Sequence, residues 1–360
     1  MRKSIHIVCG SLSILVITIL HASAQDQNAS LYHLNPFYSN PGRIGAIDYT
    51  QVAIGFINQP VEIDQSFRTA SVSGYVPIEI GLHKLVVGGI ALNDRVSDFM
   101  DANGGAIGAA LRLKLNPEMR LGFGSQLGFY KNTLGFDLTT DSQYVNGTFN
   151  SAFPSNETII NDNTSYFALS SGLYWQLVDY LGNELAFVGG SIFNYNQPNR
   201  SFIDGSTDRL PVTYKGSAGI RVLNGAYVNI TPNIQYQRFL KNNIIRAGTW
   251  VGFPLDEELL REFKLGAWYN TDGLATVSLE FYQYNFFIGA SYDQPISSTI
   301  KSARSNGIVG INFGYIFYRE SYGRHYHDSK HRKRGGDVDK KTVEKHRAKK
   351  MKNFKLRKNN

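Results

Sequence analysis

The amino-acid sequence predicts an all-β protein: an antiparallel transmembrane β-barrel of about fourteen strands, followed by a disordered or partly helical basic C-terminal tail. Three observations support this prediction. Of the 360 residues, 42% are hydrophobic and 13% aromatic but only 18% charged, against roughly 25% charged in an average soluble domain. Apolar and small or polar residues alternate through most of the chain, and an export signal precedes them. The mean hydropathy of −0.24 is too low for a protein built of several apolar spanning helices.

The N-terminus has the order of a secretory signal peptide. Arg2 and Lys3 precede an apolar stretch, and the triplet Ala22-Ser23-Ala24 follows it. We expect residues 1–24 to be removed before Gln25. An uncleaved anchor helix is the alternative, but the segment is short and ends in a processing site. Cys9, the single cysteine, lies too early in the apolar run for a lipoprotein, so the mature chain is expected to be extracytoplasmic and without disulfides.

Alternation with a period of two residues runs through the body of the chain. Phe123, Leu127 and Phe129 lie on one face of a predicted strand, and Gly124 and Gln126 lie on the other. The same pattern predicts fourteen strands, centred near Ile54, Val72, Val87, Ala109, Gly124, Ser171, Val188, Gly216, Ile230, Ala247, Leu265, Leu279, Ile288 and Ile311.

Strand length favours a membrane barrel over a soluble sandwich, because the alternating windows are about 9–13 residues long and sandwich strands have about 5–6 residues. Aromatic residues at predicted strand ends, including Phe129-Tyr130, Tyr174-Trp175, Trp268-Tyr269, Phe287 and Tyr292, are expected to form interfacial belts. Cross-strand pairing in a soluble sheet is the alternative. Asn93-Asp94 and Asp272-Gly273 are expected to form turns, and residues 132–164 and 197–211 to form long loops.

Charge separates the body from the tail. Residues 319–360 contain 16 Lys and Arg against 5 Asp and Glu, a net charge of +11. The whole chain carries +8 and the signal contributes +2, so residues 25–318 carry about −5. The chain therefore divides into a signal (1–24), a barrel (25–318) and a basic tail (319–360). A periplasmic tail could not reach nucleic acid; anionic lipid, peptidoglycan or an acidic protein remain as partners, and a merely solubilising extension is the alternative. The expected partner-binding residues are Arg332, Lys333, Arg334, Lys349, Lys350 and Lys352.

Residues for catalysis are scarce. Only His33 and His83 lie in the body, and no serine and carboxylate partners for His83 can be identified. The glycines of residues 122–128 fall on one strand face, which indicates close packing inside a barrel and not a phosphate loop. Histidines near His327 in the tail have no rigid element to fix a metal geometry. We therefore expect a protein without enzymatic activity, cofactor or metal.

Several segments, in order, resemble the PorP/SprF family of type IX secretion system membrane proteins from Bacteroidetes. The most specific is residues 34–42, in which Asn35-Pro36 and Asn40-Pro41 repeat and Gly45 follows. The resemblance continues through Gln59 in Asn58-Gln59-Pro60, the strands near residues 171–175, 215–221 and 263–269, and Tyr292-Asp293 in residues 287–293. It covers about residues 31–318. Departures are the missing tryptophan after Asn58-Gln59, Asn270 in place of an arginine, and the added tail.

The resemblance implies an outer-membrane barrel without enzymatic activity. Family members act with type IX components in secretion and, in gliding bacteria, in export or surface attachment of a large adhesin; some associate with periplasmic ring or peptidoglycan-binding subunits. We therefore expect a barrel whose loops contact a secreted client and whose tail lies in the periplasm. A passive porin or solute transporter is the competing class, and a membrane-embedded hydrolase is a third.

Overall fold

The computed structural model of the chain describes residues 31–61, 65–96, 100–135, 144–145, 148–149, 162–179, 182–203, 205–256, 261–297 and 307–317. The predicted signal peptide and the predicted tail lie outside these residues.

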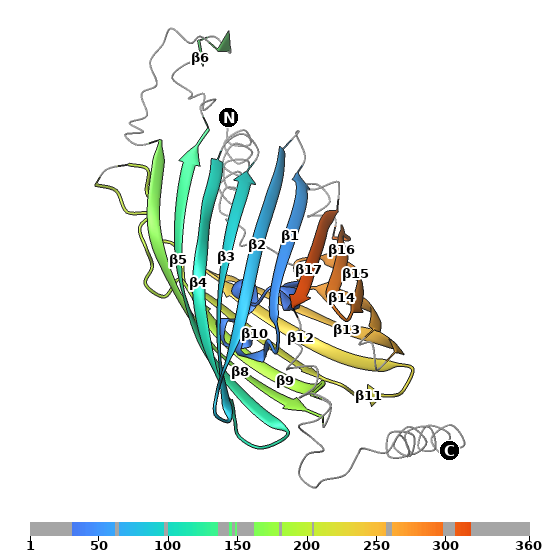
Figure 1. Cartoon of the computed structure of the whole chain (residues 1–360). Coiled ribbons are helices and arrows are strands. Elements are labelled where there is room, and N and C mark those ends of the chain that lie inside the picture. Colours follow the sequence, from blue (N-terminus) through green and yellow to red (C-terminus); the bar gives the residue numbers. More distant parts are fainter. Residues whose placement is uncertain are drawn as a thin grey trace, which may run out of the picture.

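Fourteen antiparallel strands of 8 to 16 residues make up the barrel (Figure 1). They are β1 (Thr50–Val61), β2 (Gln65–Ile80), β3 (His83–Val96), β4 (Met100–Lys114), β5 (Met119–Leu134), β8 (Asn163–Val178), β9 (Glu184–Phe193), β10 (Thr213–Ile220), β12 (Asn229–Phe239), β13 (Asn242–Asp256), β14 (Arg261–Asn270), β15 (Leu274–Gln283), β16 (Phe286–Pro295) and β17 (Ile308–Phe317).

Two pairings between non-consecutive strands close the sheet. The first strand pairs with the last, from Thr50 opposite Phe317 to Asn58 opposite Val309. β10 pairs with β12, with Thr213 opposite Phe239. Strand β11 (Leu223–Asn224) adds a short pairing to β12, and β6 (Tyr144–Val145) and β7 (Thr148–Phe149) form a separate hairpin. Every predicted strand centre lies within a barrel strand, so the predicted antiparallel barrel of about fourteen strands is confirmed.

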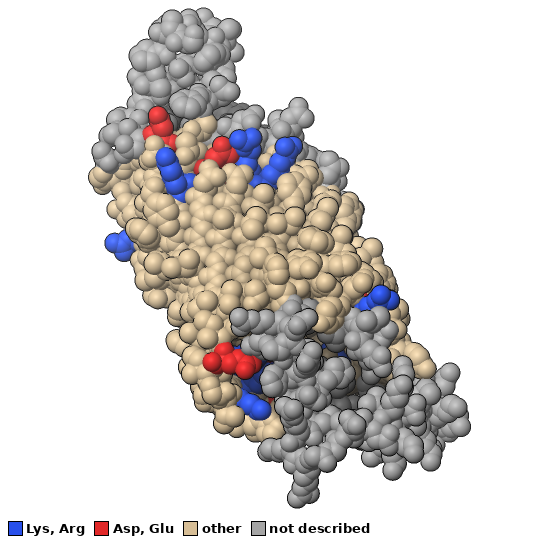
Figure 2. Space-filling model, viewed as in Figure 1, with Lys and Arg blue, Asp and Glu red and all other residues tan. Residues whose placement is uncertain are grey.

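The two faces of the wall differ as the alternation predicts. Ile107 (68% exposed) and Phe123 (55%) point outward, whereas Gln126 (8%) and Ser278 (3%) point into the lumen. On the face seen in Figure 2, most charged side chains gather toward the two ends of the barrel and the stretch between them is nearly free of charge. An apolar band between polar ends is the surface that a lipid bilayer requires.

The two rims of the barrel differ in the length of their connections. The short-turn rim carries the β2–β3, β4–β5, β8–β9, β10–β12, β13–β14 and β15–β16 connections, and β1 begins and β17 ends there. The long-loop rim carries the β5–β8, β9–β10 and β16–β17 connections. The second contains the predicted loop 197–211, whereas both ends of the predicted loop 132–164 belong to β5 and β8.

Two predictions about local structure are corrected. Asn93 and Asp94 lie inside β3 and not in a turn, because side-chain hydrogen bonds to neighbouring strands hold them there: Thr69 Oγ1 donates to Asp94 Oδ1 (2.7 Å) and Asn93 Nδ2 to Asn103 Oδ1 (2.7 Å). This extends the sheet by several residues toward the long-loop rim.

The predicted aromatic belts are only partly external. Phe129, Tyr269 and Tyr292 point outward and are 41–54% exposed, but Tyr174, Trp268 and Phe287 are at most 4% exposed and point into the lumen. Adjacent residues of a strand face opposite sides, so an aromatic pair such as Trp268-Tyr269 contributes one ring to each side. Tyr174 and Phe287 pack against the segment before β1, whereas Trp268 packs against Trp250 of β13.

Three short helices precede β1 and lie inside the barrel, where Figure 1 shows them in dark blue. They are η1 (Tyr32–Leu34), α2 (Pro36–Ser39) and η2 (Pro41–Ala46). We call residues 31–48 the plug. Within the described part of the chain, no helix has the length and apolar character needed to cross a bilayer.

Candidate functional site: the plug and the lumen wall

The repeated Asn-Pro pairs form two helix starts in succession. Asn35 Oδ1 accepts a hydrogen bond from the Phe37 amide (3.2 Å) and Pro36 begins α2. Asn40 Oδ1 accepts from the Gly42 amide (2.8 Å) and Pro41 begins η2. Asparagine is a favoured N-cap because its oxygen satisfies a free amide, and proline suits the first helical position because its missing N–H costs no bond there. The motif therefore makes the chain turn twice within a few residues.

Both asparagines also join the plug to the barrel wall. Asn40 Nδ2 donates to the carbonyl oxygen of Leu173 in β8 (2.8 Å). Asn35 Oδ1 also accepts a hydrogen bond from the Tyr75 hydroxyl of β2 (3.2 Å). Each side chain thus caps a helix and makes a contact with a strand, which an alanine could not do.

Glycines in the wall let the plug backbone approach the strands closely. A Cβ on Gly42 would lie 2.7 Å from the Gly172 carbonyl oxygen, and a Cβ on Gly124 would overlap the Pro41 carbonyl group. Such approaches are possible only without side chains. The prediction that the glycines of residues 122–128 serve close packing inside a barrel is confirmed for Gly122 and Gly124, which face plug backbone.

Polar side chains of three strands satisfy the carbonyl groups at the end of α2. Gln126 Nε2 donates to the Phe37 oxygen (3.4 Å), Ser191 Oγ to the Ser39 oxygen (2.9 Å) and Lys215 Nζ to the Tyr38 oxygen (3.0 Å). The last carbonyls of any helix lack partners within it, and here β5, β9 and β10 supply them. A cation at this end also suits the helix dipole.

Apolar contacts attach the plug to two neighbouring arcs of the barrel wall. Phe37 and Ile44 are buried with Tyr75, Val86, Ile90, Ala106 and Ala110 of β2 to β4. Leu31 and Leu34 are buried with Ala53 of β1 and Phe287 of β16. Lys215 of β10, which lies across the barrel from β1, also binds the plug, so the plug spans the lumen.

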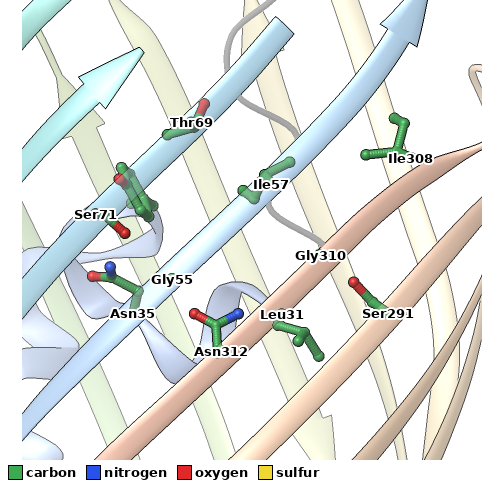
Figure 3. A pocket seen from close by; sticks show the side chains of 11 residues that line it. Leu31, Asn35, Gly55, Ile57, Thr69, Ser71, Ser291, Ile308, Gly310 and Asn312 are labelled. Carbon is green, nitrogen blue, oxygen red and sulfur yellow. The ribbon is translucent and has the colours of Figure 1, made fainter. Parts of the chain in front are cut away.

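A small cavity remains between the plug and β1, β2, β16 and β17 (Figure 3). Its lining includes Asn35, Ser71 and Asn312 together with Leu31 and Ile57, and none of its lining residues is charged. An uncharged lining offers no attraction to an ion.

Arg43 lies in the lumen among three aromatic rings. Its guanidinium carbon is 5.4 Å from the ring centre of Tyr174 and 5.8 Å from those of Tyr32 and Phe187. The Tyr174 hydroxyl in turn donates to Glu184 (2.7 Å). Desolvated cation–π contacts of this kind contribute about 2 kcal/mol. The three rings therefore stabilise the buried guanidinium charge and hold the Arg43 side chain in place.

His33 makes a polar contact on the other side of the lumen. Its Nε2 lies 2.8 Å from Glu280 Oε2, and both side chains are at least nine-tenths buried. The Tyr282 hydroxyl donates to the same carboxylate oxygen (2.7 Å). The pair joins η1 to β15, and within the described part of the chain neither group hydrogen-bonds to a serine or to an amide side chain.

Asp48, at the end of the plug, binds three cations of the wall near the short-turn rim. Its Oδ1 accepts from Lys84 (2.8 Å) and Arg112 (2.7 Å), and Arg120 Nη1 lies 3.5 Å from Oδ2. Burial disfavours the charged carboxylate, but Arg112 and Lys84 outweigh that effect and hold the pKa of Asp48 below its ordinary value. These contacts fix the point where the chain passes from the plug into β1.

Five of the eight motif residues come together in the plug: Asn35, Pro36, Asn40, Pro41 and Gly45. The other three do not join them. Gln59 lies near the long-loop end of β1, Tyr292 points outward, and Asp293 is buried on the inner face of β16. The six tail residues beginning at Arg332 lie outside the described residues.

The plug is a functional feature that the strand alternation does not predict. The signal was present, because residues 31–47 lack strand alternation yet carry Leu31, Leu34, Phe37 and Ile44. In a barrel whose outer face meets lipid, an apolar helical segment before the first strand can be buried in the lumen.

Neither body histidine lies in a site suited to catalysis or metal binding. His83 is exposed beside a turn, where its Nδ1 accepts from the Lys114 amide (3.3 Å). Among the residues that the structure describes, no three His, Cys, Asp or Glu side chains gather as metal ligands would.

Comparison with solved structures finds other barrels at low identity. The toluene transporter TbuX of Ralstonia pickettii is 8% identical, with 81% of this chain and 94% of that chain covered and a TM-score of 0.46. The toluene transporter TodX of Pseudomonas putida is 10% identical over 81% and 94%, with a TM-score of 0.44. The monoaromatic hydrocarbon channel CymD is 9% identical over 82% and 95%, with a TM-score of 0.47.

A comparison with curated proteins found no match. The model of one protein family, the type IX secretion system membrane protein PorP/SprF, matches residues 21–315. That range includes the whole plug and all but the end of the last strand. With its Asn-Pro plug and its fourteen-stranded membrane barrel, this chain belongs to the PorP/SprF family of type IX secretion system membrane proteins.

Proposed function

We propose that this protein is a non-enzymatic outer-membrane component of the type IX secretion system that supports secretion or surface attachment of a partner protein, such as a gliding adhesin. The observation that carries the proposal is the plug, which contacts β1 on one side of the lumen and β10 on the other. A barrel that evolved to conduct solutes needs a continuous polar path. A filled barrel instead offers rigid rims on which other proteins can assemble.

The asymmetry of the rims supports an orientation in the membrane. Outer-membrane barrels have short periplasmic turns and longer external loops. We therefore place the short-turn rim in the periplasm and residues 135–162, 194–212 and 296–307 outside, where they would contact the client. β17 ends at the short-turn rim, so the basic tail would continue into the periplasm.

Ion conductance of the purified full chain in planar bilayers tests the plugged-adaptor proposal against the porin alternative. We expect no steady conductance from the wild type. A variant lacking residues 31–47 serves as the control, because an emptied fourteen-stranded barrel should conduct and thereby prove that inserted protein is detectable. Steady conductance by the wild type, equal to that of the deletion variant, would overturn the proposal.

For the tail we propose contact with an acidic periplasmic protein or with peptidoglycan, through Arg332, Lys333, Arg334, Lys349, Lys350 and Lys352. The support is the net charge of +11 in residues 319–360. Pull-down from envelope extracts with the full chain and with a chain ending at residue 318 tests it. Substituting the six cations by Gln separates charge from length; unchanged partners in both variants would refute the tail's role.

A further inference from the structure

An open hollow lies on the outer face of the barrel at the long-loop rim, on the opposite side of the wall from the plug. It is formed by the β9–β10 connection, the start of β10 and the end of β12, which are adjacent in the wall. It is lined by Gln197, Arg209, Leu210, Pro211, Val212, Tyr214, Arg238 and Leu240. The lining thus combines two guanidinium groups with an apolar surface.

The alternation of side chains along β10 and β12 places this hollow on the lipid-facing side of the wall. In β10, Lys215 points inward to the plug, so its neighbour Tyr214 points outward, and Tyr214 is 46% exposed. Arg238 lies directly opposite Tyr214 in the pairing of β10 with β12 and is exposed. Both residues therefore share the outer face.

The hollow is at the edge of the apolar band. Ile192 lies opposite Tyr214 on β9 and is 41% exposed. Ile234 lies four residues before Arg238 on β12, on the same face, and is 47% exposed. Tyr236, between Ile234 and Arg238, also points outward. Tyrosine and arginine above an outward apolar surface are the arrangement found at the headgroup level of a membrane.

The two arginines carry charge that the described structure does not balance. No ion pair joins Arg209 or Arg238 to a carboxylate among the described residues, although Arg200 in the same connection pairs with Asp208 at 3.0 Å. Guanidinium groups bind phosphate in a bidentate manner and prefer it to most other anions.

An unusual turn residue supports a role for the apolar part of the hollow. Leu240 begins the two-residue turn between β12 and β13 with a φ of 54°, a conformation in which glycine is favoured. Its side chain is nevertheless 56% exposed at the edge of the hollow. A leucine in this backbone conformation is explained if its side chain contacts a ligand.

From the arginine pair, the apolar lining and the position at the edge of the lipid-facing band, we propose that this hollow binds an anionic, phosphate-bearing lipid of the surrounding leaflet. The phosphate lies between Arg209 and Arg238, and an acyl chain runs down past Leu240 and Tyr214 onto the apolar wall. A free phosphate ion would use the arginines but not the apolar lining.

Native mass spectrometry of the full chain in detergent, titrated with phosphatidylglycerol or phosphatidylcholine, tests this site. Replacing Arg209 and Arg238 by Gln should reduce retained phosphatidylglycerol about tenfold, the effect of losing one to two charge-assisted contacts, and leave phosphatidylcholine unchanged. Replacing Arg95 and Lys131 by Gln removes the same charge from the same rim on strands β3 and β5, away from the hollow, and should change neither. Equal retention by both double variants would overturn the proposal.

Two further arms identify the ligand. Leu240→Gly should weaken phosphatidylglycerol retention without destabilising the fold, because glycine suits the positive φ; undiminished retention would contradict the acyl-chain contact. Inorganic phosphate at the same concentration as the lipid should not compete. Full competition would instead assign the site to a free anion, and arginine-dependent binding of an acidic client peptide without lipid binding would assign it to a protein. None of these outcomes depends on whether the barrel conducts ions.

Discussion

Replacing Asn40 with alanine should loosen the plug without unfolding the barrel. The substitution removes the cap on the Gly42 amide (2.8 Å) and the hydrogen bond from Nδ2 to the Leu173 oxygen (2.8 Å). Loss of an asparagine cap costs about 1 kcal/mol, and loss of a buried hydrogen bond costs about 1 kcal/mol more. A total of about 2 kcal/mol corresponds to a shift of about 30-fold in the equilibrium between the seated and released plug.

Hydrogen–deuterium exchange measured by mass spectrometry on the full chain reads this equilibrium directly. Peptides covering residues 31–48 should exchange about 30-fold faster in the variant, and peptides from β12 to β16 should not change. Asn116→Ala is the matched control, because Asn116 Oδ1 also accepts from two amides, those of Glu118 and Met119, but in an exposed turn away from the plug.

The result that would refute this reasoning is unchanged exchange in the plug peptides together with an intact fold. It would mean that Asn40 is not among the contacts that hold the plug in the lumen. Uniformly faster exchange throughout the barrel would also contradict it, because the plug and the wall would then unfold as one unit and not separately.

Three further predictions concern the plug and the long-loop rim. Gly124→Ala should displace the plug and destabilise the protein by about 1–3 kcal/mol, because its Cβ would overlap the Pro41 carbonyl; Gly190→Ala, whose Cβ would meet nothing within 4 Å, should be neutral in the same thermal unfolding assay. The lowered pKa of Asp48 means that its stabilising contribution is complete above the unfolded-state pKa of about 3.9 and is lost as pH falls below it toward the folded-state value. Plug exchange should therefore accelerate below about pH 4 in the wild type, and an Asp48→Asn variant should show faster exchange at neutral pH and a weaker acid response; identical pH profiles would contradict the assignment. Leu240→Gly should raise the free energy of unfolding by about 1 kcal/mol by relieving the positive φ, and a lower melting temperature would show that the side chain stabilises the turn.

The barrel itself could be predicted from sequence because its physical signal is local. Alternation such as Phe123, Leu127 and Phe129 against Gly124 and Gln126 defines a strand and its two faces without knowledge of any partner. The number of strands follows from counting these windows. The turn at Asp272-Gly273 is confirmed for the same reason, since its chemistry is contained in two residues.

The site could be predicted only in part, because its contacts join distant parts of the chain. Asn35-Pro36 and Asn40-Pro41 could be recognised as a motif. Their local sequence does not reveal that Asn40 hydrogen-bonds to Leu173 and Asn35 to Tyr75. The inward direction of Trp268 likewise cannot be predicted until it is known which residues of β14 face the lumen. The turn predicted at Asn93-Asp94 is not formed, because hydrogen bonds to neighbouring strands outweigh the turn preference of the pair.

The position of the plug in the chain has a consequence for how the protein is assembled. Residues 31–48 are exported before any strand, yet their partners are spread from β1 to β16, and Lys215 contacts a residue 177 positions earlier. Such distant contacts form late in folding. A barrel closing without the segment would leave the Glu280 carboxylate in the lumen without His33. We therefore expect the plug to take its place when β1 joins β17, so that an assembly factor that detects closure of the seam would also detect a correctly filled barrel.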